Sequence, residues 1–467
     1  MYTLPVKSIP HYRPDHGFRT QFICLFFIFF ISASPAFAAE ENKEVQDTYK
    51  DLETFANSLS LIQQYYVDPV NTHKIMNGAI NGMLSSLDPH SGYLTPDEYK
   101  ELEEETSGSF TGVGIEVSLR DGVLTAVAPI EDTPAAKLGI QPGDQIIRIN
   151  GVETKELSLM DAVNKMRGPK GSKVVLSIRR ASWPDSRDFT LVREDIPLHS
   201  VKSMVINPGY GYLRISNFQD STTQDVQSAL DDLRSQHALK GLVLDLRNNP
   251  GGLLDQAIKV ADIFLDHGVI VSTRGRNNRE QILYEAHPNA KLEQFPMIVL
   301  INGGSASGSE IVAGALKDQK RAKVLGTTSF GKGSVQTIIP LPDGAAIRLT
   351  TAKYYTPSGA SIQATGIRPD IAVQLQALPG HSEAPANQHM VREKDLPGHL
   401  QNDTSAVSDA KDEKDTPDKG AVSGDLNQEE TFQEVNSITN TMKRLEQDSQ
   451  LRRALEVLED ENTAITH

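Results

Sequence analysis

The stretch MIVLINGGSASGSEIVAGAL, residues Met297–Leu316, indicates the class of fold. Its first part, Met297–Ile301, is a short apolar run of the kind that is buried in parallel β-sheets. A turn rich in glycine and serine follows, and the pattern then predicts a helix over Ser309–Leu316. A buried strand that turns directly into a helix is half of a βαβ unit.

The same pattern recurs around this stretch. Gly241–Leu246 (GLVLDL) is a second short apolar run, and Asp225–His237 has its apolar residues on one helical face. Strands alternate with helices from residue 196 to about 375. The sequence therefore predicts an α/β core.

The turn before the helix predicted over Ser309–Leu316 carries two candidate nucleophiles, Ser305 and Ser307. A serine placed there lies near a helix N-terminus, where backbone N–H groups can stabilise an oxyanion. Neither serine lies in a G-x-S-x-G pattern, which disfavours an α/β-hydrolase. Considered alone, Ser307 fits a helix N-cap at least as well as a nucleophile.

A second segment, Gly326–Gln336 (GTTSFGKGSVQ), nearly matches the P-loop pattern G-x-x-x-x-G-K-[ST]. Gly333 stands where that motif needs a hydroxyl for Mg²⁺. The residues after it, Val335–Pro340, are β-branched and predict a strand, so no helix dipole would face a phosphate. We therefore reject a nucleotide site.

Residues 106–190 show another pattern. Thr111–Val117 (TGVGIEV) precedes the run Leu138–Gly151 (LGIQPGDQIIRING), a helix predicted near Leu159–Arg167 and a strand predicted at Lys173–Arg180. This order resembles a PDZ domain in its bacterial, circularly permuted form.

The PDZ resemblance implies a site for a peptide C-terminus. A glycine-flanked loop can present backbone N–H groups to a carboxylate, and the adjoining strand can accept an added peptide strand. The alternative is that these glycines only form turns. The residues implied are Thr111, Gly112, Val113 and Gly114 in the carboxylate loop, with Ile115 and Val117 at the apolar pocket.

Over roughly residues 45–375 the chain resembles the C-terminal processing peptidases, or tail-specific proteases, which combine a Ser–Lys dyad with an embedded PDZ domain. The family often has Ala where Gly308 stands here. The resemblance implies an α/β (α+β) fold, with a core like that of Clp proteases and crotonases over 191–378. The motifs that carry it are Asp88–Leu94, Asp245–Gly252, Ser305–Glu310, Phe330–Gly333 and Gly366–Asp370.

Residue by residue, the resemblance assigns Ser307 as the nucleophile and Lys332 as the general base. Gln336 matches the residue that orients the lysine amine. The oxyanion hole would use the N–H of Gly308 and one N–H from Gly251 or Gly252, a choice that stays open. No cofactor is implied, and the histidines show no metal-binding spacing, so we expect no metal.

Lys332 must be neutral to accept a proton from Ser307. Its free pKa is about 10.4, whereas useful bases lie near ~7–8. Burial beside apolar groups such as Phe330 would lower the pKa of the amine, and a nearby carboxylate would raise it. We expect Glu310 to face elsewhere. The alternative for Lys332 considered alone is a surface lysine.

Three further polar residues are expected to be structural. His90, in the Asp88–Leu94 motif, could be interpreted as the histidine of a catalytic triad, but the family that the chain resembles uses a lysine as its base. Asp245 and Arg247 end a buried strand and are expected to order the loop at 248–252.

The N-terminus predicts export. Basic residues precede the ten-residue apolar run Phe22–Ile31, and Ala36-Phe37-Ala38 fits a cleavage site, so residues 1–38 read as a secretory signal cut after Ala38. The apolar run is too short to span a bilayer, which needs ~20 residues. An uncleaved anchor is the alternative. Cys24, the chain's one cysteine, would leave with the signal, and a periplasmic protein, soluble or peripherally bound to membrane, is expected.

The remaining regions flank the predicted domains. Residues 39–105 read as helical, and the polar stretch 379–428 as a disordered acidic linker. Residues 429–467 predict a helix whose apolar stripe we expect to be buried against N-terminal helices of the same or another chain, giving a homodimer or larger homo-oligomer. The formal net charge of −15 argues against a nucleic-acid partner.

The sequence thus predicts an exported serine endopeptidase that cleaves proteins near their C-termini. Its expected partners are proteins with apolar C-terminal tails and, in addition, an adaptor protein. A non-enzymatic PDZ adaptor or chaperone with a vestigial core is the alternative. We also expect Arg167 to reach Gln336 and report PDZ occupancy; the alternative is a surface arginine at a helix C-terminus.

Overall fold

The computed structural model describes residues 36–120, 122–276, 281–289, 294–375, 391–402 and 447–465. The chain divides into two compact units, Met1–Asn77 and Gly78–His467. The first contains helix α1 (Ala36–Tyr65) and the start of α2 (Thr72–Ser85). The predicted signal segment lies outside the described residues except for its last three, which begin α1. No helix in the described part of the chain has the length and apolar character needed to cross a membrane.

The larger unit is built on a six-stranded sheet with the order β10-β11-β12-β15-β16-β19. β10 and β11 are antiparallel, and every later pair is parallel. All residues of β12 and β15, which coincide with the two apolar runs, are buried. The strands are β10 Val201–Asn207, β11 Tyr210–Ile215, β12 Gly241–Asp245, β15 Met297–Ile301, β16 Lys323–Gly326 and β19 Ile371–Ala372.

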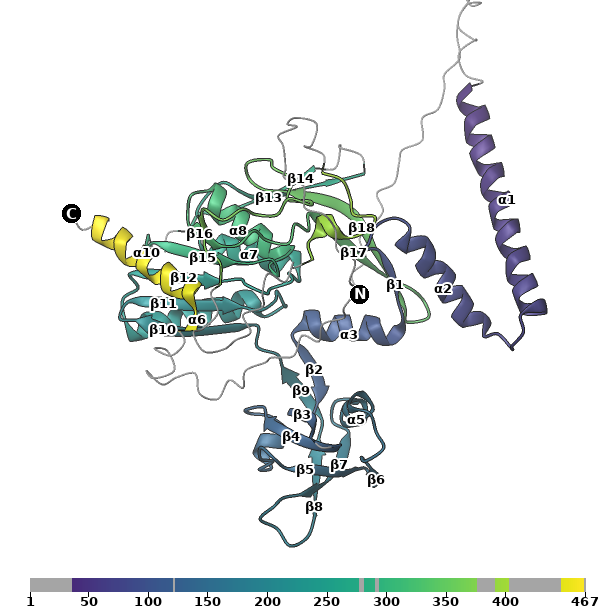
Figure 1. The fold of residues 1–467 in the computed structure, drawn as a ribbon, viewed down its shortest axis with the longest axis horizontal. Helices are drawn as coiled ribbons and strands as arrows, with labels where there is room; N and C mark the ends of the chain where they lie inside the picture. The colour runs from purple at the N-terminus through teal and green to yellow at the C-terminus, as the bar shows by residue number, and fades with distance from the viewer. Residues whose placement is uncertain are drawn as a thin grey trace, which may run out of the picture. The chain divides into compact units, whose positions relative to one another are not determined.

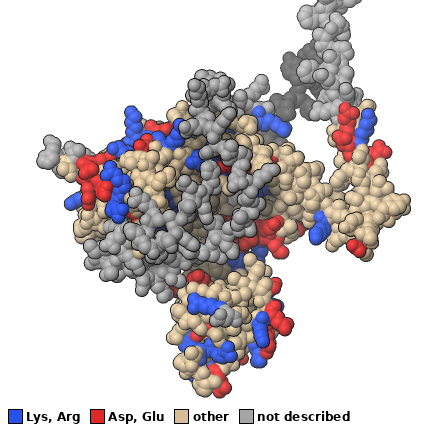
Figure 2. All heavy atoms as spheres, viewed as in Figure 1, with Lys and Arg blue, Asp and Glu red and all other residues tan. Residues whose placement is uncertain are grey.

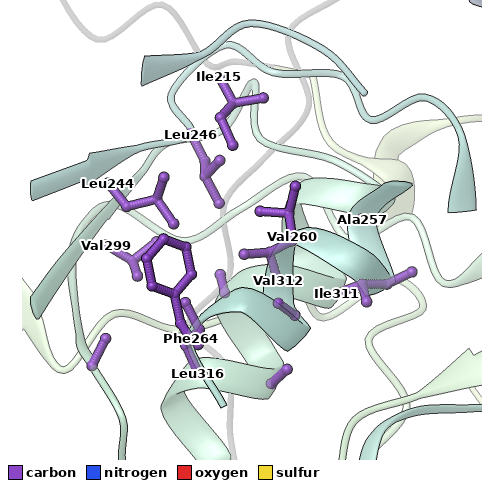
Figure 3. Packing of buried hydrophobic residues seen from close by; sticks show 14 of the residues in the cluster. Ile215, Leu244, Leu246, Ala257, Val260, Phe264, Val299, Ile311, Val312 and Leu316 are labelled. Carbon is purple, nitrogen blue, oxygen red and sulfur yellow. The ribbon is translucent and has the colours of Figure 1, made fainter. Parts of the chain in front are cut away.

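Three helices pack on one face of this sheet and form the main core. Leu244 of β12 and Val299 of β15 point toward them and meet Phe264 and Leu316 (Figure 3). Helix α8 is thereby fixed to the sheet, with its N-terminus at the end of β15. The helices are α6 Thr222–Gln236, α7 Leu254–Ile263 and α8 Gly308–Asp318.

Helix α10 (Ser449–Ile465) packs on the opposite face of the same sheet (Figure 1). Leu451 and Leu458 join a buried cluster with Tyr212 and Val243. The expectation that this stripe is buried against N-terminal helices is therefore wrong for these residues. Because the core sheet already covers them, they give no support to the predicted oligomer. The earlier part of the predicted helix, 429–446, lies outside the described residues.

A second sheet has the order β1-β18-β13-β14, with β17 paired to β18. The register places Gly92–Leu94 against residues 346–348 of β18, so the Asp88–Leu94 motif lies beside this long strand. The helix α3 (Pro96–Ser107) follows β1 and begins with a capping box at Thr95. The strands are β1 Gly92–Leu94, β13 Val269–Gly275, β14 Gln281–Glu285, β17 Ser334–Pro340 and β18 Ala346–Tyr355.

Residues 113–192 form a PDZ-type lobe, connected to α3 by the two-stranded ribbon β2-β9. Its sheet has the order β3-β4-β5-β7-β8, with β6 on β5, around a separate hydrophobic core. On the face shown in Figure 2, acidic and basic side chains of this lobe are interspersed. The elements are β2 Ser109–Gly112, β3 Ile115–Arg120, β4 Val123–Pro129, α4 Pro134–Lys137, β5 Gln145–Ile149, β6 Val152–Glu153, α5 Leu159–Met166, β7 Lys173–Arg179, β8 Arg187–Val192 and β9 Glu194–Pro197.

One part of the predicted disordered linker is ordered. Within 379–428, residues 391–402 contain the 3₁₀ helix η1 (Glu393–Asp395) and pack on the core. The Glu393 side chain is fully buried. The prediction of disorder from composition is therefore wrong for these residues, because a buried carboxylate with specific hydrogen-bond partners can order a polar segment.

Candidate active site

Ser307 and Lys332 line one cavity of about 440 Å³ in the larger unit. Its wall combines α3, the loop after β12, the start of α8, and strands β17 and β18. Tyr99, Gly252, Gln336 and Arg348 are among the other lining residues. The structure thus brings together the three residues that the sequence assigned to catalysis.

Ser307 occupies the N-cap position of α8 with φ 52°. This left-handed backbone conformation is uncommon for serine and is often found at functional sites. The residues before it are fixed: Ser305 Oγ donates to the Leu246 carbonyl at 2.8 Å, and the Ala306 N–H donates to the Asn249 carbonyl at 2.9 Å. The turn therefore holds Ser307 in a strained geometry that a helix cap does not require.

The two glycines that the sequence left open differ in the structure. The Gly251 N–H donates to Asn249 Oδ1 at 2.9 Å, and this glycine is buried. Its backbone runs so close to the nucleophile that an added Cβ would lie 2.8 Å from Ser307 Cβ. Gly252 is exposed and lines the cavity, as does Gly308. Of the three glycines assigned to the oxyanion hole, Gly252 and Gly308 are therefore the two that line the cavity.

Glu310 joins the segments that carry Ser307 and Lys332, contrary to the expectation that it faces elsewhere. Its fully buried carboxylate accepts the N–H of Ser307 at 2.9 Å and that of Lys332 at 3.0 Å, both on Oε2. Oε1 accepts the Gly331 N–H at 2.8 Å and the Ser329 hydroxyl. Sequence spacing places Glu310 on the first turn of α8, but it does not reveal that the next loop folds back over it.

Burial lowers the pKa of the Lys332 ammonium below its ordinary value, and the nearby cation Arg348 adds to this effect. Three carboxylates, Glu393, Glu310 and Asp88, act in the opposite direction. The net shift favours the neutral amine, which is the form that can accept a proton.

Burial raises the pKa of Glu310 to about 7, against the hydrogen bonds that lower it. The carboxyl is therefore only partly ionised near neutral pH, which weakens its attraction for the Lys332 ammonium. Burial also raises the pKa of the Tyr354 phenol well above its usual value, while a hydrogen bond from Ser307 lowers it. Tyr354 donates its hydroxyl to the Lys332 carbonyl.

Gln336 lines the cavity, and its side-chain amide donates to Ser334 Oγ at 3.0 Å and Thr350 Oγ1 at 3.2 Å. These bonds hold the side chain on β17 and β18. Its role in orienting the lysine amine stays a prediction.

Arg167 does not pair with Gln336 in this structure. It follows α5, donates to Glu104 Oε2 on α3 at 2.8 Å, and lies over the Phe110 ring at 4.9 Å. Glu104 was missed because the helix 96–107 carries many glutamates that look alike in the sequence. Since α3 also lines the cavity, Arg167 connects the PDZ-type lobe with the cavity wall by another path.

The predicted peptide-binding loop is divided between two elements. Thr111 and Gly112 belong to β2, which pairs with β9, while Val113 and Gly114 form the turn into β3. Gly114 has φ 74°, and an added Cβ would lie 2.3 Å from Thr133, so only glycine fits. Ile115 and Val117 lie on β3, which pairs with β4 alone among the described strands. Its other edge has no partner among the described strands.

Asp245 and Arg247 form a buried ion pair at 2.6 Å. Arg247 also binds Asp448 and Gln450 at the start of α10. Their expected role was to order the loop 248–252, and the contacts show a further role in attaching the C-terminal helix.

Three family models match this chain. Peptidase family S41 matches residues 209–373, a PDZ domain matches 125–180, and the N-terminal domain of the activating protease CtpB matches 31–98. The first two coincide with the cavity-bearing core and the PDZ-type lobe.

The chain is also similar to whole proteins of known name. It is 49% identical to the carboxy-terminal-processing protease of Bartonella bacilliformis, over 75% of this chain and 81% of that protein. It is 40% identical to the carboxyl-terminal-processing protease of Synechocystis, over 71% and 78%. Among solved structures, the photosystem II D1 C-terminal processing protease aligns over 70% of this chain and 93% of its own, with 31% identity and a TM-score of 0.41.

Proposed function

This chain belongs to the carboxy-terminal processing proteases of peptidase family S41, and we propose that it is a serine endopeptidase with Ser307 as nucleophile and Lys332 as general base. One observation carries the assignment. The buried Glu310 carboxylate binds the N–H groups of both residues at the wall of a single cavity. A vestigial core would have no need to keep these two segments in register.

The reaction follows from the protonation states. Neutral Lys332 takes the proton from Ser307 Oγ as the oxygen attacks the scissile carbonyl. The developing oxyanion accepts hydrogen bonds from the N–H groups of Gly308 and Gly252. Lys332 then protonates the leaving amine, and an acyl-enzyme remains. The same lysine activates the water that hydrolyses it, with Gln336 orienting the amine.

Substrate selection belongs to the PDZ-type lobe in this proposal. A substrate tail adds to the open edge of β3, and its C-terminal carboxylate meets the N–H groups of the loop at 111–114. An apolar terminal side chain lies against Ile115 and Val117. The N-terminal sequence supports export to the cell envelope, where the substrates would be proteins with such tails.

The test uses a folded protein substrate with an apolar C-terminal tail. We expect wild type to cleave it, and Ser307→Ala and Lys332→Ala to lose cleavage while keeping the melting temperature of wild type. A serine-reactive phosphonate should label wild type and fail to label Ser307→Ala. Binding of the tail without any cleavage or labelling by wild type would instead identify a PDZ adaptor.

A further inference from the structure

A chain of buried polar contacts reaches the Lys332 loop from far along the sequence. Glu393 Oε2 lies 2.7 Å from His90 Nε2, and Glu393 Oε1 accepts the side-chain amide of Gln363 at 2.8 Å. Gln363 Oε1 in turn accepts the N–H of Gly333 at 2.9 Å. Gly333 follows Lys332 directly, so the carboxylate is two hydrogen bonds away from the base loop.

The same segment also binds the loop on the other side of the lysine. The Glu393 N–H donates to the Phe330 carbonyl at 3.2 Å, and Arg392 donates to the Thr328 carbonyl at 3.4 Å. Phe330 and Gly333 therefore both have a partner that depends on η1. The loop between them, which carries Lys332, is held at both ends.

We propose that Glu393 is a positioning residue for Lys332, acting through Gln363, His90 and its own backbone N–H. The proposal rests on the proposed function of Lys332 as the base. It gives a catalytic role to residues 391–402, which follow the core domain in the sequence and were expected to be disordered.

The Asp88–Leu94 motif completes the arrangement. Asp88 Oδ1 accepts the N–H groups of His90 and Ser91 and the hydroxyl of Thr350, the last at 3.1 Å. Thr350 Oγ1 accepts the Gln336 amide. A continuous path of polar contacts thus leads from Gln336, through this motif, to Glu393. His90 lies in this path through the contact of its ring with Glu393.

The charges that face Lys332 come from four elements: Arg348 on β18, Glu393 on η1, Glu310 on α8, and Asp88 before β1. His90 holds two of them, because its ring binds Glu393 and its carbonyl accepts Arg348 Nε at 3.0 Å. Burial raises the pKa of Glu393, but the bonds from His90 and Gln363 outweigh it, so its pKa lies below the ordinary value. Glu393 is therefore an anion at working pH, and it moderates the effect of Arg348.

A segment that only holds the fold together would behave differently. Residues 391–402 make further contacts away from the Glu393 carboxylate, such as Asn402 to the Gln363 carbonyl at 3.0 Å. Loss of such contacts lowers the melting temperature. It does not change the protonation of the base, so the pH profile separates the two roles.

The experiment measures kcat, KM and the pH dependence of kcat/KM for Glu393→Gln with the full chain and a tailed peptide. We expect kcat to fall by about 10-fold or more, because misplacing a reacting group is costly, while KM changes by less than about twofold. Losing the negative charge destabilises the lysine ammonium, so the acid limb should move to lower pH. The control is Lys394→Gln on the neighbouring exposed residue, for which no change is expected.

Two results would overturn the proposal: an unchanged kcat, or a lower kcat with an unmoved acid limb. If Glu393→Gln does not fold, Glu393→Asp keeps the charge but shortens the reach. It should lower kcat with the limb in place, and wild-type kcat in folded Glu393→Asp would refute positioning. Activity retained by Ser307→Ala would instead refute the proposed function, so the two failures are distinguishable.

Discussion

The cavity at Ser307 and the PDZ-type lobe differ in how far their backbone N–H and C=O groups are hydrogen-bonded. Around the cavity, the N–H groups of Ser307, Gly331 and Lys332 all donate to one buried carboxylate. In the lobe, β3 pairs with β4 and leaves its second edge without a partner among the described strands. Chemistry requires groups that cannot shift, whereas recognition of an added strand requires groups that are still open. In this chain the two arrangements lie on two separate hydrophobic cores.

The largest effect is expected when either residue of the proposed Ser–Lys dyad is replaced. Ser307→Ala and Lys332→Ala should each lower kcat by at least about 10³-fold, because residues that act as a unit fail together. Binding of a tailed peptide to the lobe should persist, as isothermal calorimetry can measure. If Lys332→Ala cleaves a tailed protein at the wild-type rate, the dyad is wrong.

Glu310→Gln tests whether the cavity depends on its shared carboxylate. An amide nitrogen in place of Oε2 would face the N–H groups of Ser307 and Lys332, and each unpaired buried donor costs about 1–3 kcal/mol of unfolding free energy.

The stability of the wild type should also depend on pH, because burial raises the folded-state pKa of Glu310 from 4.5 to about 7. Protonated Glu310 therefore stabilises the fold below pH 4.5, and this stabilisation is lost as the pH rises through about 7.

Urea unfolding at two pH values checks this prediction. The gap in unfolding free energy between wild type and Glu310→Gln should be wider at pH 5 than at pH 8. A gap that is the same at both pH values would show that the carboxylate is ionised throughout this range.

Arg348→Gln tests whether the positive charge of Arg348 lowers the pKa of Lys332. Without this cation the pKa of Lys332 rises, so the acid limb of the kcat/KM profile should move to higher pH. The rate at neutral pH should fall about tenfold for each unit that the limb moves. Lys353→Gln, on the same strand, is the control and should leave the profile in place. Movement of the limb to lower pH would contradict the assigned effect of Arg348.

Val117→Thr probes the open edge of the lobe. Its shape is kept while apolar contact with a substrate tail is lost, so KM for a tailed substrate should rise about threefold to tenfold. A short untailed ester should be hydrolysed as before. Glu116→Gln, at the neighbouring exposed position, serves as the matched control. An equal effect on both substrates would place Val117 outside tail recognition.

The smallest expected effect concerns the connection between the two regions. Arg167→Ala removes a partly exposed ion pair with Glu104, which is worth under about 1 kcal/mol, so cleavage of a tailed protein should fall about twofold to fivefold. Hydrolysis of an untailed ester should not change. Lys165→Ala, exposed on the same helix, is the control, and an equal loss on both substrates would remove any link to PDZ occupancy.

Short-range patterns predicted much of this molecule. The apolar runs at 241–246 and 297–301 become strands β12 and β15, and the serine turn leads into α8 as expected. Such patterns indicate whether a segment forms a strand, a helix or a turn and which of its faces is buried. They do not report which distant segment supplies the other half of a contact.

The failures follow from this limit. The apolar stripe of α10 required burial, but its pattern could not distinguish a sheet face from a neighbouring helix. Glu393 lies in a polar stretch whose composition indicates disorder, and its partners His90 and Gln363 are distant in sequence. Glu310 accepts N–H groups from Gly331 and Lys332 on a later loop, and no spacing rule within its own helix indicates these contacts.

The attachment of α10 also has a consequence for biosynthesis. This helix is made after every strand that it covers, and Arg247, beside the loop 248–252, can bind Asp448 and Gln450 only once they have been synthesised. A nascent chain therefore displays one bare face of its central sheet until translation has passed residue 458.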